Sequence, residues 1–265
     1  MLTSIISHLP TDFPWKDSIV CYDTIESTNT AAKELASQNA PHGTVLIADQ
    51  QTGGRGRMGR CFHSPVGKGI YLSVILRPQC HASQLMHLTC AAAVAACNAI
   101  DSAVKIRPGI KWINDLVVNK RKLGGILTEL SLRSDGFVDY AVVGIGINCS
   151  QTDTDFPPEI QPIATSLSIA TGCPIDRGKV TAAILLQLQQ TMDGILVHKD
   201  AIMESYRRNC ITIGKEIAVC NAERIRYGTA IDVDSEGALL VLFSDGHTEA
   251  VNSGEVSIRG MYGYV

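Results

Sequence analysis

The chain has 265 residues, 45% of them hydrophobic, with a formal net charge of −3 and a sequence pI near 6.2. This size allows one large domain, or a large and a small one, with a substantial core. The negative charge argues against a protein whose whole surface binds nucleic acid.

Nine cysteines are scattered along the chain without the short spacing of a metal site. An odd number without such spacing predicts neither a disulfide framework nor metal ligands, and it is typical of a reducing cytoplasm. The N-terminal residues MLTSIISHLPTDF lack the basic region and long apolar core of a signal peptide. The longest apolar run, around Ala91–Cys97, is too short to cross a membrane. We therefore expect a cytoplasmic protein with no membrane contact.

A helix is expected to begin among Ser27, Thr28 and Asn29, which follow a short strand over Ile19–Tyr22. All three are good N-cap residues, and apolar residues recur after them at helical spacing. The simplest interpretation is a helix cap and nothing more. The functional alternative is that three polar side chains at a helix N-terminus recognise a polar group of a ligand.

The stretch Gln50–Arg60 is the most unusual part of the sequence, because it holds three arginines and four glycines. It connects two buried strands, Gly43–Asp49 and Ile70–Arg77, and is too polar to pack and too rich in glycine for regular structure. Loops of this length are usually functional or disordered. Glycines let backbone N–H groups approach a ligand, and arginines bind phosphate or carboxylate. We expect a mobile cationic loop that wraps an anion.

The middle of the chain predicts a long apolar helix over Ala82–Ile100 and then a β-hairpin. Its first strand, Lys111–Val118, carries Lys, Asn and Asp in its first half, and Asn119–Arg121 forms the turn. Two adjacent glycines in the returning strand, Lys122–Leu130, indicate that a ligand or another backbone comes close. A further core strand is expected over Val138–Asn148.

The C-terminal third predicts helices and then a change of pattern. A surface loop at Gln151–Ile163 and a short helix at Ser166–Ala170 precede Asp176, which caps a long helix through about His198. From Lys215 the chain alternates in short runs that are typical of antiparallel strands.

These elements predict an α+β fold in two parts. A mixed β-sheet flanked by helices is expected over residues 1–213, followed by a small antiparallel β-barrel over residues 214–265.

Five polar motifs lie at the ends or turns of these strands, and each one alone has an ordinary structural explanation. In their joint order, the chain resembles a biotin–protein ligase (biotin–acetyl-CoA-carboxylase ligase). The matching motifs are EST-N at Glu26–Asn29, QTGGRGRMGR at Gln51–Arg60, KWINDL at Lys111–Leu116, KLGGIL at Lys122–Leu127 and GIGIN at Gly144–Asn148.

The resemblance implies a class II synthetase-like catalytic domain, as in biotin and lipoate ligases, and an SH3-like C-terminal barrel. It implies that ATP activates biotin to biotinyl-5′-AMP with Mg²⁺ present. The biotin is then transferred to a lysine of a biotin carboxyl carrier protein domain.

The resemblance also implies the site residues. Lys122, Arg57 and Asp115 would be catalytic, with Asp115 orienting the incoming amine or accepting its proton. Biotin would be bound by Ser27, Thr28, Asn29, Gln51, Arg55, Gly56, Arg57 and Lys122. ATP would be bound by Arg55, Arg57, Arg60, Lys122 and Asn148, with Asn148 against the adenine.

Several departures from the family matter. Few residues precede the first strand, so we expect no DNA-binding helix-turn-helix of the kind that some members carry. Ile113 stands where the family often has Pro. Phe62 stands where it usually has Trp, which keeps an apolar wall but lacks an indole N–H.

Two other functions are compatible with parts of the sequence. A lipoate–protein ligase shares the catalytic fold, but the arginine loop and KWINDL belong to the biotin pattern. A nucleic-acid-binding module would use the arginines and the C-terminal barrel, but the loop lacks interleaved aromatic residues. The sequence leaves open which carrier is served and whether the chain forms a homodimer.

Overall fold

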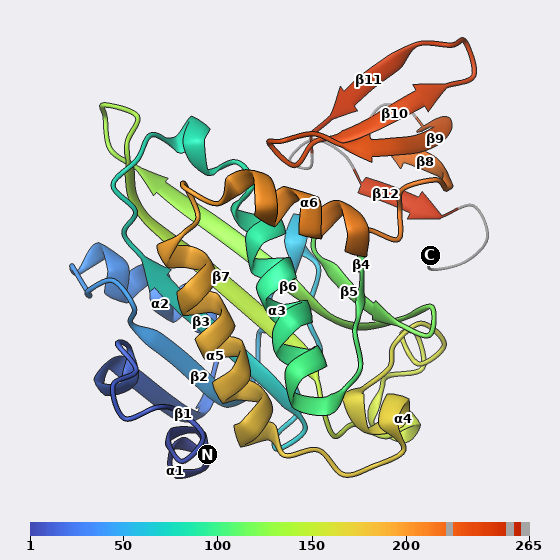
Figure 1. Ribbon diagram of the computed structural model, residues 1–265. Helices are drawn as coiled ribbons and strands as arrows, with labels where there is room; N and C mark the ends of the chain where they lie inside the picture. The colour runs from blue at the N-terminus through green and yellow to red at the C-terminus, as the bar shows by residue number, and fades with distance from the viewer. Residues whose placement is uncertain (221–224, 253–256, 261–265) are drawn as a thin grey trace.

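The computed structural model describes residues 1–220, 225–252 and 257–260, and its centre is a seven-stranded sheet in the order β1-β2-β3-β7-β6-β5-β4 (Figure 1). The strands are β1 (Ile19–Ile25), β2 (Val45–Gln51), β3 (Gly69–Leu76), β4 (Gly109–Lys111), β5 (Asp115–Val118), β6 (Arg121–Leu132) and β7 (Val138–Asn148). β1 and β2 run parallel, and the other neighbours are antiparallel. The expected mixed sheet is confirmed.

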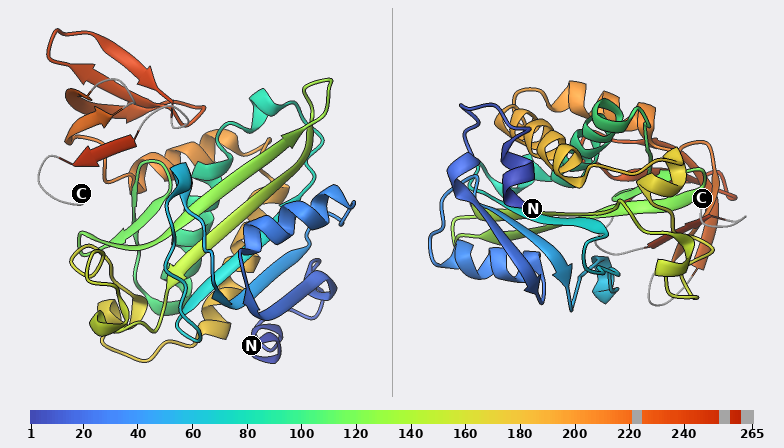
Figure 2. Two further views of the ribbon diagram at one scale, coloured as in Figure 1. Left: turned by 180° about the vertical axis from the view of Figure 1, so that it is seen from behind. Right: turned by 90° about the horizontal axis from the view of Figure 1, so that it is seen from below.

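Helices cover both faces of this sheet (Figure 2). On one face lie α3 (Leu88–Val104) and α5 (Arg177–Asp193), with α1 (Leu2–Ile6) against α5 and α6 (Lys199–Asn209) against α3. On the other face lies α2 (Thr28–Ser37), whose Ala32 and Ala36 pack on the sheet. The short helix α4 (Leu167–Thr171) follows the loop after β7. Because α2 covers only part of its face, the remaining strands there are accessible to a ligand.

The core forms between the sheet and the α3–α5 layer. Every residue of β3 is buried, since helices pack on both of its faces. The buried alanines of α3 let that helix approach the sheet closely. The segment Ala82–Val104 is long and apolar enough to cross a membrane, but 67% of its most apolar window is buried inside the fold. The segment is therefore explained as a core helix.

Two predicted elements are wrong in their extent. Lys111–Val118 is not one strand, because Lys111 pairs with Asp115 across a tight turn at Trp112–Asn114. The predicted helix through His198 ends at Asp193, where Gly194 caps it, and α6 begins at Lys199. In both places buried apolar residues occupy a turn, so hydrophobicity alone did not reveal the break.

The C-terminal part is a five-stranded antiparallel sheet in the order β11-β10-β9-β8-β12. Its strands are β8 (Glu216–Cys220), β9 (Ile225–Val233), β10 (Leu239–Phe243), β11 (Thr248–Val251) and β12 (Ser257–Gly260). β11 and β12 lie at opposite ends, and no pairing within the described residues joins them. In place of the expected β-barrel, the described strands form an open antiparallel sheet, which is consistent with an SH3-like domain.

Candidate active site

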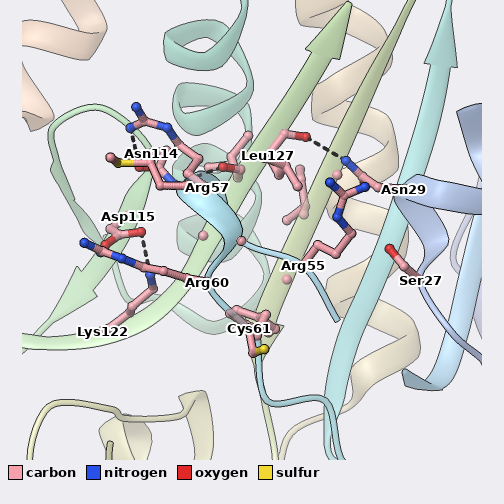
Figure 3. A pocket seen from close by; sticks show the side chains of 18 of the residues that line it. Ser27, Asn29, Arg55, Arg57, Arg60, Cys61, Asn114, Asp115, Lys122 and Leu127 are labelled. Atoms are coloured by element: carbon pink, nitrogen blue, oxygen red, sulfur yellow. Dashed lines mark hydrogen bonds and ion pairs between the residues drawn. The ribbon is translucent and has the colours of Figure 1, made fainter. Parts of the chain in front are cut away.

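A cavity opens on the α2 face of the main sheet, over β6 and β7 and beside the N-terminus of α2 (Figure 3). Five segments that are distant in sequence line it: Ser27–Asn29, Gln51 with the loop Arg55–Phe62, the turn Lys111–Asp115, the β6 strand with Lys122, and Gly144–Gly146 of β7. The motifs that were grouped from the sequence therefore converge on one site.

The polar residues at the N-terminus of α2 serve both as a helix cap and as part of the cavity wall. Ser27 is the N-cap, and its Oγ accepts a hydrogen bond from the Thr30 N–H at 3.4 Å. Thr28 donates to Gln51 Oε1 from its backbone N–H at 2.8 Å and from its hydroxyl at 3.1 Å. Gln51 Nε2 in turn donates to Ser64 Oγ at 3.1 Å. These contacts fix Thr28 and Gln51 at the wall of the cavity.

The Asn29 side chain makes its hydrogen bonds to other residues of the protein. Its Nδ2 donates to the Leu127 carbonyl at 3.2 Å and to Glu129 Oε2 at 3.0 Å, while its Oδ1 lies 2.6 Å from Ser73 Oγ. A Cβ on Gly144 would stand 2.0 Å from Asn29 Oδ1, which explains the first glycine of GIGIN. Asn29 therefore joins α2 to the sheet at the edge of the cavity.

The arginine loop is more regular than expected. The Gly56 N–H donates to the Arg60 carbonyl at 2.7 Å and the Phe62 N–H to the Gly54 carbonyl at 2.8 Å, so the loop forms a short hairpin. Its tip is a 3₁₀ turn over Arg57–Gly59. The expectation of no regular structure is wrong because backbone hydrogen bonds within the loop replace the apolar contacts it lacks.

Phe62 forms an apolar wall at the base of this hairpin. Its ring meets Tyr71 edge-on, with 6.3 Å between the centroids. A Cβ on Gly146 would lie 2.7 Å from the Phe62 ring, so the second glycine of GIGIN makes room for it. The expected apolar wall is therefore present without an indole N–H.

The three arginines of the loop line the cavity. Arg57 Nη1 donates to Asn114 Oδ1 at 3.2 Å (Figure 3). Arg55 Nη1 lies 3.8 Å from Glu129 Oε1. Arg60 is exposed. Burial lowers the pKa of Arg57. The cavity thus concentrates guanidinium groups where an anionic ligand would neutralise them.

The β4–β5 turn and the start of β6 add two lysines and a carboxylate. Lys122 Nζ donates to Asp115 Oδ1 at 2.6 Å. Burial, with the nearby positive charges of Lys122 and Arg60, lowers the pKa of Lys111 despite the opposing effect of Asp115. Gly125 leaves room for this pair, since a Cβ there would lie 3.3 Å from Asp115 Oδ1. Cations outnumber carboxylates in this cavity, so it favours anions.

Asn148 is the one predicted site residue that is not among those lining the cavity. Its buried amide donates to the Thr165 carbonyl at 3.0 Å and accepts from Gln151 Nε2 at 3.1 Å. The adenine contact stays a prediction.

Sequence reasoning missed several residues of the site. Ser73 and Glu129 support Asn29, while Lys111 and Asn114 line the cavity with no assigned role. Ser73 carried a signal, since it is the one polar residue of the apolar strand IYLSVIL and a buried hydroxyl needs a partner. Glu129 gave no such signal in the sequence, because its burial could not be predicted from the neighbouring residues.

The mixed sheet therefore carries a cationic cavity under an arginine hairpin, an arrangement suited to an anionic substrate. The model of the biotin/lipoate A/B protein ligase family matches residues 21–148, and that of the biotin protein ligase C-terminal domain matches residues 212–259.

Relatives and solved structures agree with these matches. The bifunctional ligase/repressor BirA of Bacillus subtilis is 40% identical over 232 residues, covering 86% of this chain and 70% of the relative. The biotin–[acetyl-CoA-carboxylase] ligase of Mycobacterium tuberculosis is 30% identical, covering 88% and 87%. Biotin protein ligase from Aquifex aeolicus in complex with biotin and ATP superposes with a TM-score of 0.77 at 29% identity, covering 91% and 98%. The chain belongs to the biotin–protein ligase family.

Proposed function

We propose that this enzyme biotinylates a carrier protein in two steps. The biotin carboxylate attacks the α-phosphorus of ATP, forming biotinyl-5′-AMP and releasing pyrophosphate. A lysine amine of a biotin carboxyl carrier domain then attacks the anhydride carbonyl, forming the amide and releasing AMP. The arginine hairpin over a cationic cavity carries this proposal, since the first step brings two anions together.

The biotin rings would lie at the α2 end of the cavity. Biotin offers an apolar bicycle with one ureido group, so its pocket needs aliphatic walls and a few fixed polar groups. Leu72, Leu127 and Ile145 provide the walls, while Ser27, Thr28 and Gln51 provide the polar groups. Asn29 would contribute by holding the helix terminus in place.

The reacting groups would lie under the hairpin. Arg55, Arg57 and Lys122 would neutralise the carboxylate and the α-phosphate, whose repulsion otherwise opposes the attack. Gly56 would present its backbone closely, and Arg60 would meet the phosphates at the mouth of the cavity. The hairpin would also keep water away from the anhydride.

Asp115 would act in the second step. A free lysine is protonated at neutral pH and must lose a proton to become a nucleophile. Asp115 would orient the amine and help to accept that proton. Its present partner is Lys122, which the phosphate would attract away when the nucleotide binds.

Mg²⁺ would enter with the nucleotide. This ion is commonly held by substrate phosphates with one or two carboxylates, and Asp115 is the carboxylate that lines the described cavity. The residues therefore fit a phosphate-bound ion, which would shield the charge of the departing pyrophosphate.

The wider assignments are proposals of the same kind. We place the domain boundary between residues 213 and 214, because the strands of the second sheet begin at Glu216. We propose a cytoplasmic enzyme whose macromolecular partner is a carrier domain, without DNA or membrane contact.

Pyrophosphate release tests the function directly. With ATP and Mg²⁺, biotin should support release, and lipoate should not. Release with lipoate alone would instead support a lipoate ligase. Salt-sensitive binding of single-stranded DNA, without a thermal shift on adding biotin plus ATP, would favour the nucleic-acid alternative.

A further inference from the structure

The turn between β4 and β5 is hydrogen-bonded to residues that do not themselves line the cavity. Lys111, Asn114 and Asp115 line the cavity from this turn. The Trp112 backbone N–H donates to Thr212 Oγ1 at 2.9 Å, and the Tyr206 hydroxyl donates to the Ile113 carbonyl at 3.1 Å. The position of the cavity side chains therefore depends on residues outside the main sheet.

Trp112 connects the turn to the C-terminal sheet. Trp112 is among the residues that line the cavity and is 5% exposed, while its indole N–H donates to the Gly237 carbonyl at 2.9 Å. Gly237 belongs to the β9–β10 turn of the C-terminal sheet. The indole N–H and the Gly237 carbonyl are both buried and satisfy one another, so one residue of the cavity lining is bonded to the second sheet.

The β9–β10 turn is itself rigid. Asp234 Oδ1 accepts from the Glu236 N–H at 2.9 Å and from the Ala238 N–H at 2.8 Å. Gly237 has a φ of +91°, and a Cβ there would lie 3.0 Å from Cys90 Sγ. A glycine is needed both for this conformation and for this close packing.

α6 anchors the same turn. Arg207 Nε donates to the Val233 carbonyl at 2.6 Å, and Lys199 forms an ion pair with Glu236. The Gly237 carbonyl is therefore a fixed acceptor. A mobile carbonyl could move together with Trp112, whereas a fixed carbonyl restrains the position of the indole.

We propose that Trp112 is a positioning residue through which the C-terminal sheet holds the turn Lys111–Asp115 at the catalytic cavity. Without its indole N–H, the Gly237 carbonyl would be buried and unsatisfied, and a shift of the turn would relieve this. Such a shift would move Asp115 and its partner Lys122. The proposal rests on the function proposed above.

The test replaces Trp112 by Phe in the full-length protein, which keeps an aromatic ring and removes the N–H. Amide exchange over residues 112–116 should become about 10-fold faster, because the turn opens more often. Single-turnover formation of biotinyl-AMP should slow about 10-fold, since misplaced groups lose the benefit of orientation. Thr212→Val removes a second restraint on the same turn and should act in the same direction.

Trp15→Phe is the matched control, because Trp15 is the other tryptophan of the chain and is also buried. It should leave turn exchange and the rate of biotinyl-AMP formation unchanged even if it lowers the melting temperature. Wild-type exchange over residues 112–116, or a wild-type rate, in both Trp112→Phe and Thr212→Val would overturn the proposal. If the wild-type enzyme forms no biotinyl-AMP, the proposed function fails instead. The exchange measurement then still decides whether Trp112 positions the turn.

Discussion

Lys122 and Asp115 form an ion pair in the wall of the cavity, yet they are expected to serve different half-reactions. Lys122→Ala removes a cation that faces the carboxylate and the α-phosphate. Biotinyl-AMP formation should therefore fall about 100-fold, as for the loss of one charge-stabilising donor. Pyrophosphate release in a single turnover measures this step.

Asp115→Asn keeps the shape of the side chain and removes its charge. It should slow transfer from chemically supplied biotinyl-AMP to a carrier domain more than Lys122→Ala does, because the incoming amine loses its carboxylate partner. If Asp115→Asn slows both half-reactions equally, Asp115 instead organises the nucleotide site or the turn.

Glu129 is expected to stabilise the protein in a pH-dependent way. Although burial acts to raise the pKa of Glu129, hydrogen bonds from Lys33 and Asn29 outweigh it and lower the pKa from its ordinary value of 4.5. A carboxylate with a lowered folded-state pKa stabilises the protein above the unfolded pKa, and this contribution is lost as the pH falls through the folded-state pKa.

Glu129→Gln should therefore lower the free energy of unfolding by about 1 kcal/mol at neutral pH. This is the size expected for a partly screened ion pair with its hydrogen bonds. The difference from wild type should shrink as the pH falls below 4.5. Urea unfolding across this range measures it. A difference that does not depend on pH would mean that the shape of the side chain matters and its charge does not.

At the scale of elements, the arginine hairpin is expected to close over its ligands. Its backbone bonds define a hairpin, but Met58 at the tip is 61% exposed, so little apolar burial opposes opening. Amide exchange over residues 53–60 should slow sharply when biotin and ATP are both present, because the ligand charge then holds the arginines. Equal protection with and without ligands would identify a static hairpin.

The sequence predicted the elements best where local chemistry decides them. β7 has its predicted bounds, since Val138–Asn148 is a continuous strand pattern, and the Asn119–Lys120 turn has the positive φ values of a tight hairpin. The turn at Trp112–Asn114 was missed because Trp112 is buried by a residue 125 positions away. Similarly, Glu129 meets Asn29 across 100 positions. Motif order identified the segments of the site but not the contacts that support them.

At the scale of the whole molecule, one edge of the main sheet is open. β5 pairs with β6 as far as Gly125, the Ile126 N–H donates to the Asn114 carbonyl, and no other described strand pairs with Leu127–Leu132 on that side. Leu130 and Leu132 are 43% and 52% exposed there. An unpaired edge with exposed apolar side chains is a template for another strand.

We therefore expect a homodimer formed through this edge at high protein concentration, because two copies of β6 could pair and cover these leucines. Sedimentation equilibrium should show mass that rises with concentration, and Leu132→Lys should shift the chain toward monomer through repulsion at the new contact. Val197→Lys is the control, since Val197 is 81% exposed and lies outside the edge. A monomer at every concentration would contradict the dimer, and a dimer that Leu132→Lys does not weaken would contradict this interface.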